Sequence, residues 1–286
     1  MVRIMLCDVK SGTFTVVKVN EDAYGVSADC AWVLDGSTGL NGKRLVADEQ
    51  GSDAQWYAAA FSNFLKENLM SEDETLPEIF SRGVTVVWNA FCERAGGTVA
   101  KEDVPCTLGT AVRLKDGFLE YINVGDCLLL VRKKDGSVME LLDDTLCAMD
   151  ANTLNLAMEI AKSKDILLCE CRKEILPELR RVRMTMNTPE GYISLANDAQ
   201  SVLKAKNGKI PTHEIQQICL LSDGFGQYFK LFSLTSDAAS FMDRIASAQP
   251  RDLFDELLQA QKDDATLMNY PRFKLSDDST IVYASI

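Results

Sequence analysis

An apolar run that ends in an acidic turn is the feature that most constrains how this chain can fold. Residues 218–221 are apolar, and Ser222-Asp223-Gly224 follows them at once. Such an abrupt change is typical of a buried strand that presents a carboxylate at its end. Because Asp-Gly is also a common turn dipeptide, this stretch alone indicates no more than a strand followed by a tight turn.

Three other aspartates stand in the same kind of position. Asp22 lies in NEDAYGV, Asp35 in AWVLDGSTGL and Asp278 in LSDDSTIVYA, and each adjoins an apolar run rich in β-forming residues. Carboxylates gathered at several strand ends are what a site for hard cations requires, because such ions prefer oxygen ligands. The sequence therefore indicates an acidic centre, and the alternative is a set of unrelated aspartate turns.

Composition limits the class of protein. The chain has 286 residues, 47% of them hydrophobic, which suffices for a sizeable core. A formal net charge of −12 without a basic block argues against a nucleic-acid-binding protein. No apolar stretch reaches the roughly 18 residues of a membrane-spanning helix, and the apolar run at the N-terminus is too short for a signal peptide. We expect a cytoplasmic protein with no membrane or nucleic-acid partner.

The cysteines and the single histidine indicate no zinc site. Nine cysteines without regular spacing fit reduced thiols better than a disulfide framework. Cys169 and Cys171 are separated by one residue, which is not a zinc-ligand spacing, and His213 is the sole histidine. We assign His213 no catalytic role.

Hydrophobic periodicity predicts blocks of strands and helices within one domain over residues 1–286. The expected strands are 13–19, 31–35, 191–196, 215–221 and 280–286, and residues 106–137 have the turns of an antiparallel meander. The expected helices are 48–70, 75–95, 236–248 and 251–261, with Pro250 ending the third. Residues 143–187 form a mostly helical, insertion-like segment, and its basic residues Arg180, Arg181 and Arg183 are interpreted as a solvated helix face. Asp126, inside the meander, is either a turn residue or a ligand at a buried edge, and the residue pattern favours the turn.

Taken in order, these pieces resemble the metal-dependent protein phosphatase family, which is protein phosphatase 2C-like. The matching motifs are N-E-D-A-Y-G at 20–25, V-L-D-G at 33–36, L-G-T-A at 108–111, N-V-G-D at 123–126, G-Y at 191–192, L-S-D-G at 221–224 and D-D-S-T-I-V at 277–282. Each motif is short, but their joint order and spacing are specific. The resemblance implies an α+β fold, a four-layer α-β-β-α sandwich of two antiparallel sheets packed face to face with helices on both outer faces.

The resemblance also implies a site and an activity. Four aspartates would hold two Mn²⁺ or Mg²⁺ ions together with the backbone carbonyl of Gly36; they are Asp22, Asp35, Asp223 and Asp278. Asp126 would help to hold a third, weaker ion, and Glu21 would act through a water molecule. A water bridging the two ions would attack the phosphorus of a phosphoserine or phosphothreonine in a phosphoprotein substrate.

The chain departs from the family pattern at several positions. Val17 stands where the family usually has a phosphate-gripping arginine, and the neighbouring Lys18 is the candidate phosphate-binding cation in its place. Neighbours on a strand face opposite ways, which counts against Lys18. Ser37 replaces a histidine found in many members, and Gly226-Gln227 replaces a common acidic residue. Two functions stay open: an active phosphatase, or a regulatory binding module that keeps the fold but has little turnover.

Overall fold

The structure, a computed structural model, describes residues 4–40, 42–46 and 51–286 of the chain. Its strands are β1 (Cys7–Phe14), β2 (Ala23–Val26), β3 (Cys30–Ser37), β4 (Cys106–Lys115), β5 (Phe118–Val124), β6 (Leu128–Lys133), β7 (Val138–Leu141), β8 (Lys206–Pro211), β9 (Ile215–Leu221) and β10 (Ser279–Ser285). Its α-helices are α1 (Asp53–Asn68), α2 (Leu76–Arg94), α3 (Thr145–Lys164), α4 (Arg172–Met184), α5 (Ala199–Val202), α6 (Asp223–Lys230), α7 (Ala238–Ser247) and α8 (Pro250–Asp263).

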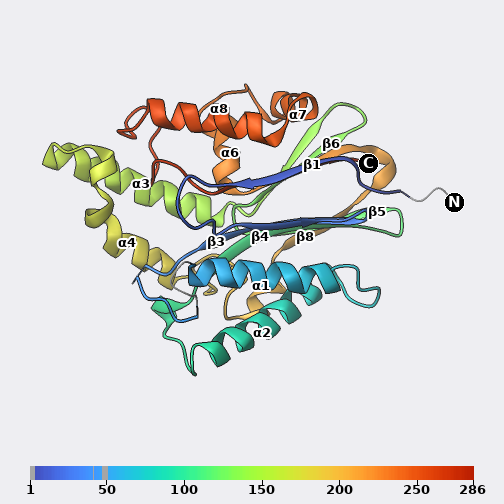
Figure 1. Ribbon diagram of the computed structural model, residues 1–286, viewed down its shortest axis with the longest axis horizontal. Helices are drawn as coiled ribbons and strands as arrows, with labels where there is room; N and C mark the ends of the chain where they lie inside the picture. Colours follow the sequence, from blue (N-terminus) through green and yellow to red (C-terminus); the bar gives the residue numbers. More distant parts are fainter. Residues whose placement is uncertain (1–3, 41, 47–50) are drawn as a thin grey trace.

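Two antiparallel sheets lie face to face between layers of helices (Figure 1). The first sheet has the order β1-β10-β9-β6-β7, and the second has the order β2-β3-β4-β5-β8. Helices α7 and α8 cover the outer face of the first sheet, and α1 and α2 cover that of the second. The predicted four-layer sandwich is confirmed. Within the described ranges, no helix combines the length and apolarity needed to cross a bilayer.

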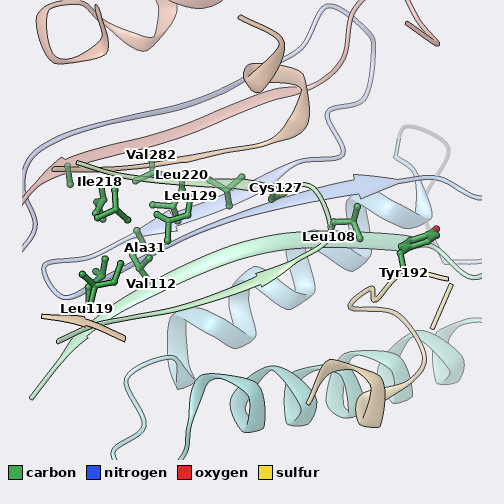
Figure 2. Close-up of a cluster of buried hydrophobic side chains, with 14 of the residues drawn as sticks. Ala31, Leu108, Val112, Leu119, Cys127, Leu129, Tyr192, Ile218, Leu220 and Val282 are labelled. Atoms are coloured by element: carbon green, nitrogen blue, oxygen red, sulfur yellow. The ribbon is translucent and has the colours of Figure 1, made fainter. Parts of the chain in front are cut away.

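A continuous apolar layer fills the space between the two sheets. Figure 2 shows Leu129, Leu220 and Val282 of the first sheet pointing toward Ala31 and Val112 of the second. All five side chains are fully buried. Removing this much apolar surface from water is the main force that holds the sheets together.

Strand β3 shows why its sequence is apolar at consecutive positions. Ala31 and Val33 belong to the layer between the sheets, whereas Trp32 and Leu34 pack with the residues of α1 and α2. A strand that is buried on both faces needs apolar side chains at odd and even positions alike. Burial is unbroken from Cys30 to Leu34, so Asp35, the next residue of the strand, is placed at the edge of the apolar interior.

The long helices confirm the expected core packing of their aromatic side chains. Phe61 of α1 and Phe80 of α2 lie with ring centroids 5.6 Å apart and are fully buried. Helix α1 begins after Ser52, whose side chain accepts a hydrogen bond from the backbone of Gln55. The start predicted at residue 48 lies outside the described residues.

Three local expectations are wrong. Residues 16–18 form a bend rather than a strand, because the Thr15 side chain accepts a hydrogen bond from Val17 N and turns the chain after β1. Residues 191–196 are irregular rather than a strand, since the Asn187 side chain accepts a hydrogen bond from the backbone N–H of Ser194. Asp223 opens the helix α6 instead of a tight turn. As expected, the helix α7 ends before Pro250, and Pro250 itself is the first residue of α8, a position where its missing N–H costs nothing.

Strand β8 was not predicted at all. Its sequence, KNGKIP, has no apolar alternation, and it pairs antiparallel with β5 at the edge of the second sheet. An edge strand that is mostly exposed carries little of the pattern from which strands are recognised.

The segment at 143–187 forms the α3 and α4 helices, which project from one side of the sandwich (Figure 1). Six buried residues form a small apolar cluster there: Ala157, Ala161, Leu168, Cys171, Ile175 and Leu267. The helical character is as expected, while its description as an insertion within a single domain stays a prediction.

Candidate metal centre

The aspartates predicted from strand ends gather at one end of the sheet stack. Asp35 lies near the end of β3, and Asp22 directly precedes β2, which pairs with that strand. Asp223 is separated from β9 by Ser222 alone, and Asp278 directly precedes β10, which pairs with β9. The proximity of Asp223 raises the pKa of Asp35, and charge repulsion by Asp278 raises the pKa of Asp22. Side chains more than 180 residues apart in sequence therefore meet in one site.

A cavity of about 190 Å³ opens at this point. It is lined by five aspartates: Asp35, Asp126, Asp150, Asp223 and Asp277. Gly36 also lines it, and the cations at its wall are Arg172, Arg183 and Lys274. The site is thus a strongly acidic cavity with positive groups at its border.

Burial and mutual repulsion make these carboxyl groups hard to ionise. Burial is the main cause that raises the pKa of Asp22, Asp35 and Asp126 well above the usual range, and the neighbouring aspartates add to it. The same causes raise the pKa of Asp150 and of Asp277 to about 6. Such a cluster would be relieved by a bound cation, which supplies the missing positive charge.

Three buried carboxylate oxygens have no hydrogen-bond partner: Oδ1 of Asp22, of Asp126 and of Asp278. Buried polar atoms normally have a partner, so orphaned oxygens of this kind fit a ligand role. Oxygen donors without any cysteine or histidine suit Mg²⁺ or Mn²⁺. Among the residues that the structure describes, no three acidic, cysteine or histidine side chains are already spaced as a ligand set. The residues fit a divalent ion by chemistry, and the side chains would adjust to hold it.

Two glycines allow the backbone segments of the site to approach closely. A Cβ at Gly36 would lie 2.4 Å from the carbonyl oxygen of Glu21, and one at Gly224 would lie 2.0 Å from that of Asp278. Neither position can carry a side chain unless the backbone shifts. The Glu21 carboxylate accepts hydrogen bonds from the backbone and the hydroxyl of Thr38, which ties the residues before β2 to the end of β3.

The structure separates the roles of the adjacent Asp277 and Asp278. The Asp278 side chain is turned toward the backbone that precedes β2, where its Oδ2 accepts a hydrogen bond of 2.8 Å from Glu21 N. Asp277 lines the cavity, and its carboxylate lies 2.5 Å from the Lys274 ammonium. Sequence reasoning missed Asp277, although the doublet itself signals that either residue can face the site. It also missed Asp150 on α3, which has no local signal.

Arginines of α4 reach the end of β3. Arg183 donates a hydrogen bond of 2.8 Å to Ser37 Oγ, and Arg180 donates one of 3.2 Å to the carbonyl of Leu40. Arg180 and Arg181 are exposed, as expected of a solvated face, and Arg181 pairs with Glu178 of its own helix. The interpretation of this basic run as solvated is wrong for Arg183, because tertiary packing carries α4 over the acidic cavity.

Lys18 borders the site from the other side. It is exposed within the bend at 16–18 and lines a hollow of about 320 Å³ together with Lys274, Asp277 and Asp278. Val17, at the position of the family's arginine, is 60% exposed. The strand alternation that counted against Lys18 does not apply, because these residues are not in a strand.

Comparison with protein families identifies the family of proteins to which this chain belongs. A model described as Protein phosphatase 2C matches residues 16–261, which is most of the chain. The chain belongs to the protein phosphatase 2C family. The resemblance carried by the short motifs is thereby confirmed. No curated protein sequence is significantly similar to the chain.

Solved structures of bacterial phosphatases share the fold of this family member. A bacterial serine phosphatase has a TM-score of 0.56 at 15% identity, covering 98% of this chain and 97% of that one. The serine/threonine phosphatase Stp1 from Staphylococcus aureus has a TM-score of 0.55 at 14% identity, covering 98% and 94%. The catalytic domain of the phosphatase PstP, solved with two manganese ions, has a TM-score of 0.53 at 15% identity, covering 98% of both chains. At these identities the likeness establishes the fold.

Replacing Lys18 tests the phosphate-binding role predicted for it. If its ammonium contacts the substrate phosphate, Lys18→Ala is expected to raise KM for a phosphopeptide about ten- to a hundred-fold, the worth of one partly solvated charged contact. The kcat should change much less if the contact is equal in ground and transition states. Val17→Arg is the matched variant. It should lower KM, because a guanidinium group can donate two parallel hydrogen bonds to the phosphate oxygens. Steady-state kinetics on one phosphopeptide checks both, and an unchanged KM in Lys18→Ala would remove Lys18 from the site.

Asp150→Asn is expected to stabilise the metal-free protein near neutral pH. Burial and repulsion by Asp223 raise the pKa of Asp150 to about 6. The pKa of about 6 lies above that of an aspartate in the unfolded chain. Ionisation of the Asp150 carboxyl group therefore lowers the free energy of unfolding progressively from about pH 4 to about pH 6, and this loss of stability stays complete at higher pH. The asparagine avoids this loss, so Tm should rise by roughly 3–8 °C at about pH 8 and hardly at about pH 4.

Thermal unfolding in EDTA at the two pH values measures this effect. Asp144→Asn is the matched control on the same segment, because its hydrogen bond with Lys206 lowers the pKa of the Asp144 carboxyl, and its removal is not expected to stabilise. An equal rise of Tm at both pH values for Asp150→Asn would contradict the electrostatic explanation.

Proposed function

We propose that this protein is a metal-dependent phosphoserine/phosphothreonine protein phosphatase. The observation that carries the proposal is the convergence of half-buried aspartates from β3, from α6 and from the segment before β10 on one cavity, within a chain of this family. Buried oxygens of Asp22, Asp126 and Asp278 lack hydrogen-bond partners, which fits a role as cation ligands. We further propose phosphoprotein substrates and a cytoplasmic location. The net charge of −12 agrees with a partner other than nucleic acid.

The residues proposed to hold two Mn²⁺ or Mg²⁺ ions are Asp22, Asp35, Asp223, Asp278 and the carbonyl of Gly36, with Asp126 toward a third, weaker ion. Asp277 joins them as a candidate, because it lines the cavity beside Asp35 and Asp223. When bound, two such ions lower the pKa of a shared water and neutralise charge on the phosphoryl oxygens. The PstP domain with two manganese ions has this fold, which supports the same requirement here.

The remaining polar groups would position the reactants. The Glu21 carboxylate, held by Thr38, would orient a water at the edge of the ion pair. The cations at the border of the cavity would hold the substrate phosphate: Lys18 from the bend after β1, and Arg183 from α4. Arg183 has the planar fork that matches two phosphate oxygens. His213 lies outside the set of residues that line the cavity, so the chain's histidine is not proposed to move a proton.

A regulatory binding module is the second candidate. It is favoured by Val17 and Ser37, which stand where many members of the family have an arginine and a histidine. Such a protein would keep the fold, bind a phosphoprotein and release little phosphate. The retained aspartates favour the active enzyme, because a site without turnover does not need buried, mutually repelling carboxylates.

Phosphate release from a phosphoserine peptide and from p-nitrophenyl phosphate in Mn²⁺ tests the proposal. The 286-residue chain is compared with a double variant, Asp35→Asn with Asp223→Asn, purified identically to control for contaminating phosphatases. We expect release by the wild type and none by the variant. Binding of the phosphopeptide without release would favour the regulatory module instead.

A further inference from the structure

A second, larger cavity continues from the acidic one. It has a volume of about 550 Å³ and lies between α3, α6 and the segment that precedes β10. Six residues line both cavities: Asp126, Asp150, Asp223, Phe273, Lys274 and Asp277. The two spaces are therefore continuous, and a molecule whose phosphate lies over the aspartates can extend into the larger one. We call this larger space the side groove.

The walls of the side groove are mainly apolar. Six residues supply most of that surface: Leu128, Leu142, Leu154, Leu231, Pro271 and Phe273. They come from the first sheet, from α3 and from the segments that follow α6 and α8, so the groove exists only in the folded chain. Its one lysine away from the aspartates, Lys230, pairs with Glu140 at 3.6 Å. A surface of this kind favours an apolar side chain and disfavours a charged one.

Gly226 leaves one side of the side groove without a side chain. It lies in α6, three residues after Asp223, and it lines the groove. Gly226 is buried, yet a Cβ built on it would meet no atom within 4 Å. Open space beside a buried helical residue means that the helix faces a void there. A residue with a side chain at this position would project into the groove.

We propose that the side groove binds an apolar side chain next to the phosphorylated residue of the substrate, so that this protein prefers phosphoserine or phosphothreonine flanked by a large aliphatic or aromatic residue. The proposal rests on the proposed phosphatase function. The occupant is the substrate itself, because the groove opens onto the cavity where its phosphate would lie. An acidic neighbour is disfavoured, since the apolar wall of the groove would leave its carboxylate without solvation.

Two phosphoserine peptides that differ only in the flanking residues test the proposal. One carries leucine and the other glycine on both sides of the phosphoserine, and kcat/KM is measured for each with the wild-type chain in Mn²⁺. We expect a preference of at least about tenfold for the leucine peptide, as for an apolar group that fills a matching pocket. p-Nitrophenyl phosphate, which has no flanking residue, reports separately on the metal centre.

Gly226→Leu tests the location. Its side chain should fill the groove, and the preference for the leucine peptide should fall to about twofold or less. Gly226→Ala adds one methyl group and should keep most of the preference. Leu154→Ser, at the half-buried α3 wall, is a second variant that should weaken the preference if Gly226→Leu does not fold.

The outcomes separate the two proposals. Turnover of both peptides at equal kcat/KM, or a preference that survives Gly226→Leu and Leu154→Ser alike, would overturn the side groove and leave the phosphatase function intact. No turnover of any phosphate ester, p-nitrophenyl phosphate included, would overturn the proposed function and this inference with it. A preference that both variants reduce would support the proposal.

Discussion

Removal of divalent ions is expected to abolish phosphate release by this protein, and Mn²⁺ or Mg²⁺ is expected to restore it. The reason is the chemistry of the site, in which buried carboxylates are the donors that line the cavity opposite the cations. Without an ion, the water that attacks phosphorus keeps its ordinary high pKa and is a poor nucleophile. Release of phosphate from a phosphopeptide, measured in EDTA and then after addition of each ion, checks the expectation.

A second readout does not depend on turnover. An ion that binds the folded state alone should raise Tm in proportion to the logarithm of its concentration. Full activity in excess EDTA would contradict the metal requirement, and so would restoration by Zn²⁺ alone, because all-oxygen sites suit Mg²⁺ and Mn²⁺. A rise of Tm with Mn²⁺ but no phosphate release would instead favour the regulatory module.

Asp35→Asn and Asp223→Asn are each expected to lower kcat by at least about 10³-fold while the protein stays folded. Each change removes a charge that the metal ions and their water require. The fold should tolerate both, since an amide keeps the size of the carboxyl group. Burial and repulsion raise the pKa of Asp35, so its replacement by a neutral residue should raise the Tm of the metal-free protein at neutral pH.

Asp255→Asn on α8 is the matched control for these variants. Asp255 is an exposed aspartate paired with Arg251 on the same helix, and surface pairs of this kind contribute little. Steady-state kinetics at saturating Mn²⁺ and thermal unfolding in EDTA should separate the site variants from the control. Near-wild-type turnover by either Asp35→Asn or Asp223→Asn would show that the assignment of that residue is wrong.

Local sequence determined the elements and the order in which they follow one another. The apolar run at 31–35 predicts a strand, and the helical spacing of apolar residues around Phe61 and around Phe80 predicts two helices that pack in the core. Apolar runs that end next to an aspartate, as at Asp35 and Asp223, predict the acidic centre. These patterns can be recognised in the sequence because each involves residues that lie close together along the chain, within one or two helical turns or within one strand.

Expectations failed where a local pattern was weak or was overridden. The bend at 16–18 has β-branched residues, yet a hydrogen bond from Val17 N to the Thr15 side chain turns the chain. Strand β8 is polar because it lies at a sheet edge, and its pairing with β5 decides its conformation. In both cases the deciding interaction is one that periodicity does not encode.

The border of the site was decided by tertiary structure alone. Asp150 and Arg183 reach the cavity because α3 and α4 project beside it, and nothing near them in the sequence marks either residue. Asp277 and Asp278 are neighbours in the chain, and tertiary contacts separate them: Asp278 accepts a hydrogen bond from Glu21 N, whereas Asp277 lines the cavity and pairs with Lys274. The sequence by itself determined which carboxylates stand at strand ends, because strand and turn patterns are local. The packing of distant elements determined which charges and which apolar walls surround them, because those contacts join residues that are far apart in the chain.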